Sequence, residues 1–139
     1  MSNAAVTSDV SDAIVAKLVA DLDPVPVGDS RAPANVGAPA LYAVVDHMDG
    51  MVRSDLDQAF HRVKHVVQVR SVGATRNAAQ YVQDAVRTSL LDGTLTVPGV
   101  TFLQVDLEVG GRVSVDNDGD PYSLMVGHDR FAFHFDARG

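Results

Sequence analysis

The sequence predicts an α+β fold, a single domain in which two helices pack against a mostly antiparallel or mixed sheet of four to five strands. Three observations indicate this. Residues 75–91 place apolar side chains at the spacing of an amphipathic helix. Residues 63–72 and 101–109 alternate with the period of two that is typical of half-buried strands. A chain of 139 residues, 46% of them hydrophobic, is long enough for one buried core.

The first helix is expected to run from Ser8 or Ser11 to Asp21, because either serine can accept a hydrogen bond from an N–H of the first turn. Pro24 ends it, since the residue before a proline avoids the α region. Residues 1–7 are expected to form a flexible N-terminus, and residues 2–4 are typical of a remnant left by cloning. The predicted apolar stripe consists of Ile14, Val15, Leu18, Val19 and Leu22.

Residues 24–40 contain four of the six prolines, and this predicts an extended arm lying on the surface. Residues 41–45 form a short apolar run that is typical of a central strand. Residues 46–62 break the pattern and are predicted to form a loop or a projecting hairpin. Strand character resumes over residues 63–72, with His65, Val67 and Val69 on one face.

The second helix has predicted signals at both ends. Thr75 is the predicted N-cap, and Asp92-Gly93 is the predicted left-handed C-terminal stop. Its predicted apolar stripe consists of Ala78, Ala79, Val82, Ala85, Val86, Ser89 and Leu90. Its predicted outward face consists of Arg76, Gln80, Gln83, Asp84 and Arg87.

The C-terminal part is predicted to be all strand. Residues 101–109 alternate strictly, Gly110-Gly111 bends the chain, and a further strand follows before the acidic turn at residues 116–120. In the last segment apolar residues occupy even positions up to Val126 and odd positions from Phe131 onwards. This change of parity predicts a bulge or sharp bend over residues 127–130.

Charge and composition argue against several classes of binding partner and of chemistry. The 11 Lys and Arg against 18 Asp and Glu give a formal net charge of −7, and no basic cluster occurs. Binding to nucleic acid or to an anionic membrane requires a basic patch. No apolar stretch approaches the roughly 20 residues that span a bilayer. Since there is also no cysteine, disulfides and thiolate chemistry are excluded. We therefore expect protein partners, no nucleic acid and no membrane.

Two motifs approach the pattern of a metal site. His61 and His65 would share one face of a helix, but they run into a predicted strand and no third ligand is marked. Residues 116–120 (DNDGD) match half of a calcium loop, but Met125 stands where a bidentate glutamate is required. We interpret the first as ordinary histidines and the second as a hairpin turn. The sequence predicts no catalytic residue, no metal and no cofactor.

A second class of function stays open, namely a small α+β ligand-binding protein or hydrolase with a His/Asp pocket. It requires a concave site in which at least two histidines meet carboxylates. The available histidines are His47, His61, His65, His128 and His134.

Three segments carry a resemblance to a known family. They are APALYAVV at residues 38–45, HVVQVRSVGATRNAAQYVQDAVRTSLL at 65–91 and TVPGV at 96–100. The most specific part is the pattern V-x-V-x-S-x-G-x-T-R between Val67 and Arg76. Taken in order, these segments resemble tail terminator proteins of long-tailed bacteriophages, a head–tail joining family, especially those of actinobacterial phages.

The resemblance implies a structural virion protein and not an enzyme. Its subunits would form a ring, expected to be a hexamer, that caps the tail tube, stops tube polymerisation and offers a docking surface for the head connector. The implied partners are further copies of the chain, the major tail tube protein and a head-connector or head completion protein, with no cofactor. The implied location is the virion tail, after synthesis in the host bacterial cytoplasm. Another head–tail joining or minor tail protein is the neighbouring alternative.

By the same analogy, segments 46–62 and 116–120 are the expected contact surfaces, where charges would set register. Arg76 is added because the helix dipole disfavours a cation at a helix start, so a partner carboxylate would stabilise it. The alternative for this arginine is a side chain reaching into water. The candidate interface residues are Asp49, Arg53, Asp55, Asp57, Arg62, Arg76, Asp116 and Asp118.

Overall fold

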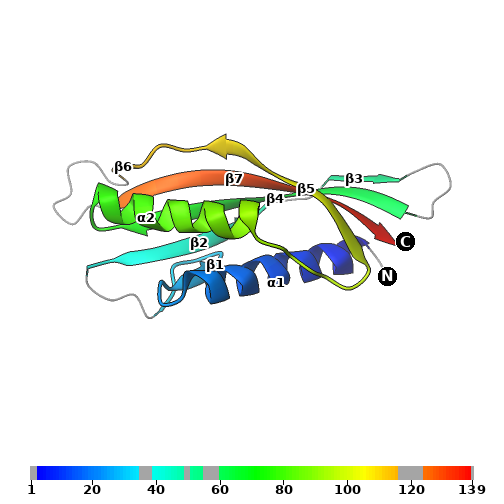
Figure 1. Cartoon of the computed structure of the whole chain (residues 1–139), viewed down its shortest axis with the longest axis horizontal. Coiled ribbons are helices and arrows are strands. Elements are labelled where there is room, and N and C mark those ends of the chain that lie inside the picture. The colour runs from blue at the N-terminus through cyan, green and yellow to red at the C-terminus, as the bar shows by residue number, and fades with distance from the viewer. Residues whose placement is uncertain (1–2, 35–38, 49–50, 55–59, 116–123, 139) are drawn as a thin grey trace.

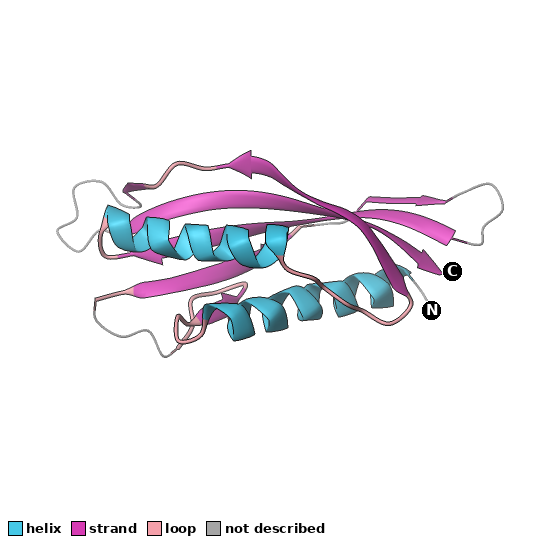
Figure 2. Cartoon of the chain, viewed as in Figure 1, coloured by secondary structure: helices cyan, strands magenta, loops and turns pink. Residues whose placement is uncertain are grey.

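The computed structural model describes residues 3–34, 39–48, 51–54, 60–115 and 124–138. These residues form one mixed sheet with the helices packed on one of its faces, which confirms the predicted α+β class (Figure 1, Figure 2). The core lies between the helices and the sheet, where Phe131, Phe133 and Phe135 are fully or almost fully buried. No helix in the described part of the chain has both the length and the apolar character needed to cross a membrane.

The main path of the sheet has five strands in the order β1, β2, β4, β7 and β5. Their bounds are Val27–Asp29, Leu41–His47, Phe60–Gly73, Met125–Arg138 and Val100–Gly110. Two short strands extend this path, because β3 (Met51–Ser54) pairs with β4 and β6 (Ser114–Val115) pairs with β7. Among the described strands only β1 and β2 pair in parallel, and all the other pairs are antiparallel.

Helix α1 (Asn3–Leu22) ends before Pro24 as predicted but begins earlier than Ser8 or Ser11. Alanine has the highest helix propensity, so Ala4 and Ala5 favour the longer helix. Ser11 does not cap the helix, since its hydroxyl forms a hydrogen bond of 3.0 Å with Nε2 of His65. The buried stripe repeats every four residues and consists of Val10, Ile14, Leu18 and Leu22. Val19, which was predicted to belong to this stripe, is exposed.

Helix α2 (Arg76–Arg87) continues into a single π-helical turn, η1 (Thr88–Asp92). The predicted apolar stripe is confirmed, but Gln83 is buried and does not belong to the outward face. The predicted left-handed stop is wrong, because Gly93 has a φ of −86°. Gly93 is required there for space instead. A Cβ atom at this position would lie 2.4 Å from the carbonyl oxygen of Ser89 and 2.5 Å from Nζ of Lys17.

The predicted N-cap of α2 is confirmed, since Oγ1 of Thr75 accepts a hydrogen bond of 3.1 Å from the backbone N–H of Ala78. Replacing Thr75 with alanine removes this acceptor and should lower the free energy of unfolding by about 1 kcal/mol. Urea denaturation measures the loss. Thr96→Ala, at an exposed loop position, is the control and should change the free energy by less than about 0.5 kcal/mol. Equal losses in the two variants would contradict the capping role.

The proline-rich arm contains a strand that the sequence did not predict. β1 is only three residues long and lies between prolines, so its signal is shorter than the window in which alternation can be recognised. After β1 the arm turns back onto the sheet, where a Cβ atom on Gly28 would lie 3.0 Å from Cδ of Pro33. The strand predicted at 41–45 is confirmed and extends to His47. In the segment predicted as a loop or hairpin, β3 and β4 pair antiparallel as a hairpin.

Strand β7 is continuous, and the predicted bulge over residues 127–130 is wrong. Its register with β4 runs without a shift from Met125 to Arg138. The two irregularities lie instead in β5, between Phe102 and Gln104 and between Leu107 and Val109. They also break the strict alternation predicted for β5, so that Phe102 packs against Phe135 with ring centroids 5.5 Å apart.

Candidate interaction surfaces

The two faces of the sheet differ in what covers them. Odd-numbered side chains of β4 and β7, such as Val67 and Phe133, lie under the helices and are buried. Even-numbered side chains lie on the other face, which is free of helices in the described part of the chain (Figure 1). We call this surface the open face. Its polar and exposed members are Asp46, Lys64, Gln68, Arg70, Thr101, Gln104, Asp106, Glu108, Val109, His128, Arg130, His134 and Asp136.

Ion pairs cross the strands of the open face. The guanidinium of Arg70 binds Asp46 through two hydrogen bonds, of 2.7 Å and 3.2 Å. Lys64 pairs with Glu108 across the sheet. These pairs are about one-third exposed, so each contributes at most about 1 kcal/mol to stability. They therefore fix side-chain positions on the face more than they stabilise the fold.

Arg130 lies near the middle of the open face and differs from the other cations there. Its Nε atom is buried and has no hydrogen-bond partner among the described residues. It is opposite Gln68 on β4 and opposite Val109 on β5. The Val109 side chain is 52% exposed, although β-branched apolar side chains usually avoid solvent. Because arginine is enriched in protein interfaces, this part of the open face is a candidate for contact with another protein.

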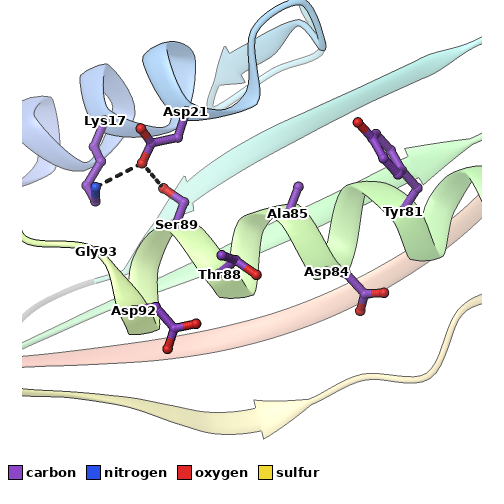
Figure 3. A pocket seen from close by; sticks show the side chains of 9 residues that line it. All are labelled: Lys17, Asp21, Tyr81, Asp84, Ala85, Thr88, Ser89, Asp92 and Gly93. Atoms are coloured by element: carbon purple, nitrogen blue, oxygen red, sulfur yellow. Dashed lines mark hydrogen bonds and ion pairs between the residues drawn. The ribbon is translucent and has the colours of Figure 1, made fainter.

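The helix layer carries an open groove of about 650 Å³, shown in Figure 3. At one wall, Asp21 of α1 accepts hydrogen bonds from Nζ of Lys17 at 2.8 Å and from Oγ of Ser89 at 2.7 Å. These bonds lower the pKa of the Asp21 carboxyl below its ordinary value. The groove lining consists of Lys17, Asp21, Tyr81, Asp84, Ala85, Thr88, Ser89, Asp92 and Gly93. Three aspartates against one lysine, itself paired with Asp21, make the groove acidic.

A buried carboxylate connects α2 to the sheet. Asp129 of β7 is 1% exposed and accepts hydrogen bonds from Nε of Arg87 at 2.7 Å and from Nη2 at 2.9 Å. It also accepts bonds from Nε2 of Gln83 at 3.1 Å and from the backbone N–H of Gly111 at 3.0 Å. The hydrogen bonds to Asp129 raise the pKa of Arg87. The cluster holds the β5–β6 connection against α2, and we interpret it as structural.

A second buried polar contact lies under α1. His65 is 1% exposed, bonded only to Ser11 among the described residues, and its ring centroid is 6.4 Å from that of His47. Burial, and to a smaller extent the nearby His47, lower the pKa of His65 to about 4. Nε2 of His47 in turn lies 2.8 Å from Oδ1 of Asp29. His65 is therefore a neutral histidine of the core at physiological pH.

The histidines do not gather around either described groove. His128 and His134 lie on the open face, whereas His47 and His65 lie on the helix side of the sheet. Neither the helix groove nor a smaller pocket of about 210 Å³ near Phe102 has a histidine in its lining. His61 and His65 lie four residues apart on a strand, which separates their Cα atoms by about 13 Å. A strand therefore does not provide the shared helix face on which the two-histidine metal motif depends.

Most of the predicted interface residues lie outside what the structure describes. This applies to Asp49, Asp55, Asp57, Asp116 and Asp118, and with them to the turn at 116–120. Arg53 and Arg62 are directly opposite each other in the β3–β4 hairpin, but their side chains are not described. Arg76 is exposed at the first residue of α2. The open face and the helix groove were not predicted, because both combine residues that are far apart in the sequence.

The fold is shared with chains of solved structures. One belongs to a structure of the virion of a native gene transfer agent particle. It is 13% identical, with a TM-score of 0.68, over 96% of this chain and 98% of that chain. A second, which carries no functional name, is 16% identical, with a TM-score of 0.50, over 97% and 96% of the two chains. At these identities the likeness establishes the fold alone. No protein-family model and no curated protein matches the sequence.

Proposed function

We propose that this chain is a structural subunit of a virion, and within that class a tail terminator that forms a ring on the end of the tail tube. The ring, expected to be hexameric, would stop tube polymerisation and dock the head connector. In this role the protein acts by its shape and its charged surfaces, without turnover of a substrate. Its expected location is the virion tail.

The observation that carries this proposal is the fold shared over almost the whole length with a chain of a virion particle. The sequence resemblance to tail terminators was drawn from residues 38–45, 65–91 and 96–100 and is independent of that structural likeness. A fold shared over almost the full length of both chains at 13% identity is expected of a subunit that must fit neighbours of fixed size. The neighbouring alternative, another head–tail joining or minor tail protein, would share this reasoning but act at a different place in the particle.

The candidate contact residues stay part of this proposal. The β3–β4 hairpin extends past the end of β2 (Figure 1), and Arg53 and Arg62 are opposite each other next to its last described pair, Ser54 and His61. A hairpin that extends in this way, with paired arginines, is suited to reach an acidic surface on the tube or on a neighbour. Arg76 stands at the opposite end of β4, so the two sites would contact different partners or different copies.

The test is tail assembly in the presence and absence of the protein, scored by electron microscopy. With the protein, we expect tubes of one length with a capped end. Without it, we expect tubes that grow beyond that length and lack caps. Tubes of unchanged length and intact ends in its absence would overturn the tail terminator role. Normal tails that fail to join heads would favour another head–tail joining protein.

A further inference from the structure

We propose that the open face of one copy docks on the helix groove of a second copy, with Arg130 of the first facing Asp84 of the second. This inference rests on the proposed function, because it specifies how subunits would meet in the ring. The two surfaces are built by different elements, so one copy can present both at the same time.

The open face supplies the cation and the apolar contact. Arg70 and Lys64 already have partners within the chain, whereas Nε of Arg130 is buried and unpartnered among the described residues. Nε itself is not accessible from outside, but the residue is partly exposed, so a carboxylate of another copy would bind the outer guanidinium nitrogens of Arg130. Val109 lies next to Arg130 on β5 and would lose its 52% exposure on docking.

The helix groove supplies the matching carboxylates and an aromatic side chain. Asp84, Thr88 and Asp92 are exposed and follow one another at a spacing of four residues, along one side of α2 and η1 (Figure 3). They point away from the buried stripe that packs on the sheet. Tyr81 is 63% exposed at the same groove, and aromatic side chains are enriched in protein interfaces. Figure 3 shows that Tyr81 and Asp84 point to opposite sides of α2, so the tyrosine would contact the docked copy at a separate place.

The position of these surfaces favours a ring over a closed dimer. The helix layer and the open face lie on opposite sides of the sheet. The contact therefore joins two different surfaces and cannot be the symmetric contact of a two-fold dimer. Such head-to-tail contacts repeat from copy to copy and close into a ring when the rotation allows it. The alternative contact, pairing through the outer edge of β5, is disfavoured by its two register irregularities, since bulges interrupt the ladder that a new strand would need.

Crosslinking tests the contact directly, because the chain has no cysteine and single cysteines can be introduced without background. Val109→Cys, on the open face, is mixed with Thr88→Cys, in the helix groove, which carries a size tag. A short bismaleimide then joins neighbouring thiols. We expect the mixed 109–88 product to exceed the 109–109 product by at least about tenfold. The control replaces Thr88→Cys with Thr96→Cys, an exposed loop position, and should give only background.

A charge reversal tests the role of Arg130. Arg130→Glu on the open-face copy should lower the 109–88 product about tenfold or more, as expected for the loss of about 1.4 kcal/mol or more of contact energy. Asp84→Arg on the groove copy should restore it. Arg112→Glu, at an exposed position in the β5–β6 connection, is the matched control and should leave the yield unchanged. Circular dichroism establishes that each variant is folded.

The outcomes separate this inference from the proposed function. Equal 109–88 and 109–96 yields, or a dominant 109–109 product, would overturn the docking geometry even if tubes overgrow without the protein. A specific 109–88 product that tolerates Arg130→Glu would overturn the role of Arg130. If the crosslink forms as expected while tail length is independent of the protein, the contact stands and the tail terminator role does not.

Discussion

Replacing Asp129 with alanine should lower the free energy of unfolding by about 3 kcal/mol, the largest effect we expect from a single substitution here. The substitution leaves Arg87, Gln83 and the N–H of Gly111 without their shared acceptor. Breaking a buried ion pair costs about 3–5 kcal/mol. We expect the lower end, because the Arg87 side chain is 33% exposed and can be partly solvated by water. Urea denaturation followed by circular dichroism measures the loss.

Two variants make the Asp129 result specific. Asp106→Ala removes a carboxylate from the open face, where its side chain is 43% exposed, and should cost less than about 1 kcal/mol. Arg87→Met combined with Asp129→Ala removes both charges, and should cost less than the sum of the two single changes. A loss for Asp129→Ala no larger than that for Asp106→Ala would show that the buried cluster does not hold α2 against the sheet.

Acid should destabilise the protein through His65 as the pH falls from about 6.5 towards 4. The pKa of His65 is about 4 in the folded chain, against an ordinary value of 6.5. Between these values the unfolded chain binds more protons than the native chain, so the free energy of unfolding falls as the pH falls. The contribution amounts to about 2 kcal/mol between pH 7 and pH 4.5. Urea titrations at the two pH values measure it.

A variant without a titrating group at this position isolates the effect. His65→Gln should lose about 2 kcal/mol less than the natural chain over the same pH interval, whereas Thr96→Ala, at an exposed loop position without a titrating side chain, should lose as much as the natural chain. The pKa of Asp21 is lowered as well, but its contribution is lost only at more acid pH, below its ordinary value of 3.8. Identical pH slopes for the natural chain and His65→Gln would contradict the account.

Sequence patterns over a few neighbouring residues correctly predicted the features that such residues determine by themselves. The cap at Thr75, the stripe of α2 and the alternation over 63–72 are all short-range patterns, and the structure has them where the sequence places them. Ser11 shows the limit of this reasoning, because the same hydroxyl that can cap a helix bonds His65 from 54 positions away. The sequence allows either hydrogen bond, and only the folded arrangement determines which one the Ser11 hydroxyl forms.

The bulge predicted in the last strand was wrong for a similar reason. An aspartate usually faces solvent, so the presence of Asp129 did not indicate that the odd positions before Phe131 are buried. In the structure Asp129 is buried on the same side as Phe131 and Phe133, because Arg87 and Gln83 supply its hydrogen bonds from α2. Gln83 was placed on the outward face of α2 for the same reason. Buried polar pairs are recognised only when both partners are known, and no local pattern connects residues 83, 87 and 129.

The surfaces proposed to carry function were the least predictable. The open face joins β4, β5 and β7, and the helix groove joins α1 to α2 and η1. Each depends on strand order and helix packing that the sequence does not list. The net charge of −7 does predict protein partners. It does not show that Arg130, whose Nε has no partner among the described residues, lies on the open face while an acidic groove lies in the helix layer.

The most direct test of the central claim, that this chain acts by fitting copies of itself to a tube end, is to locate the protein on isolated tail tubes. Tubes without terminator are incubated with gold-labelled protein and examined by electron microscopy. We predict label at one end of each tube and no further growth when tube subunits are added. Label scattered along the tube, or no label while growth continues, would contradict the claim.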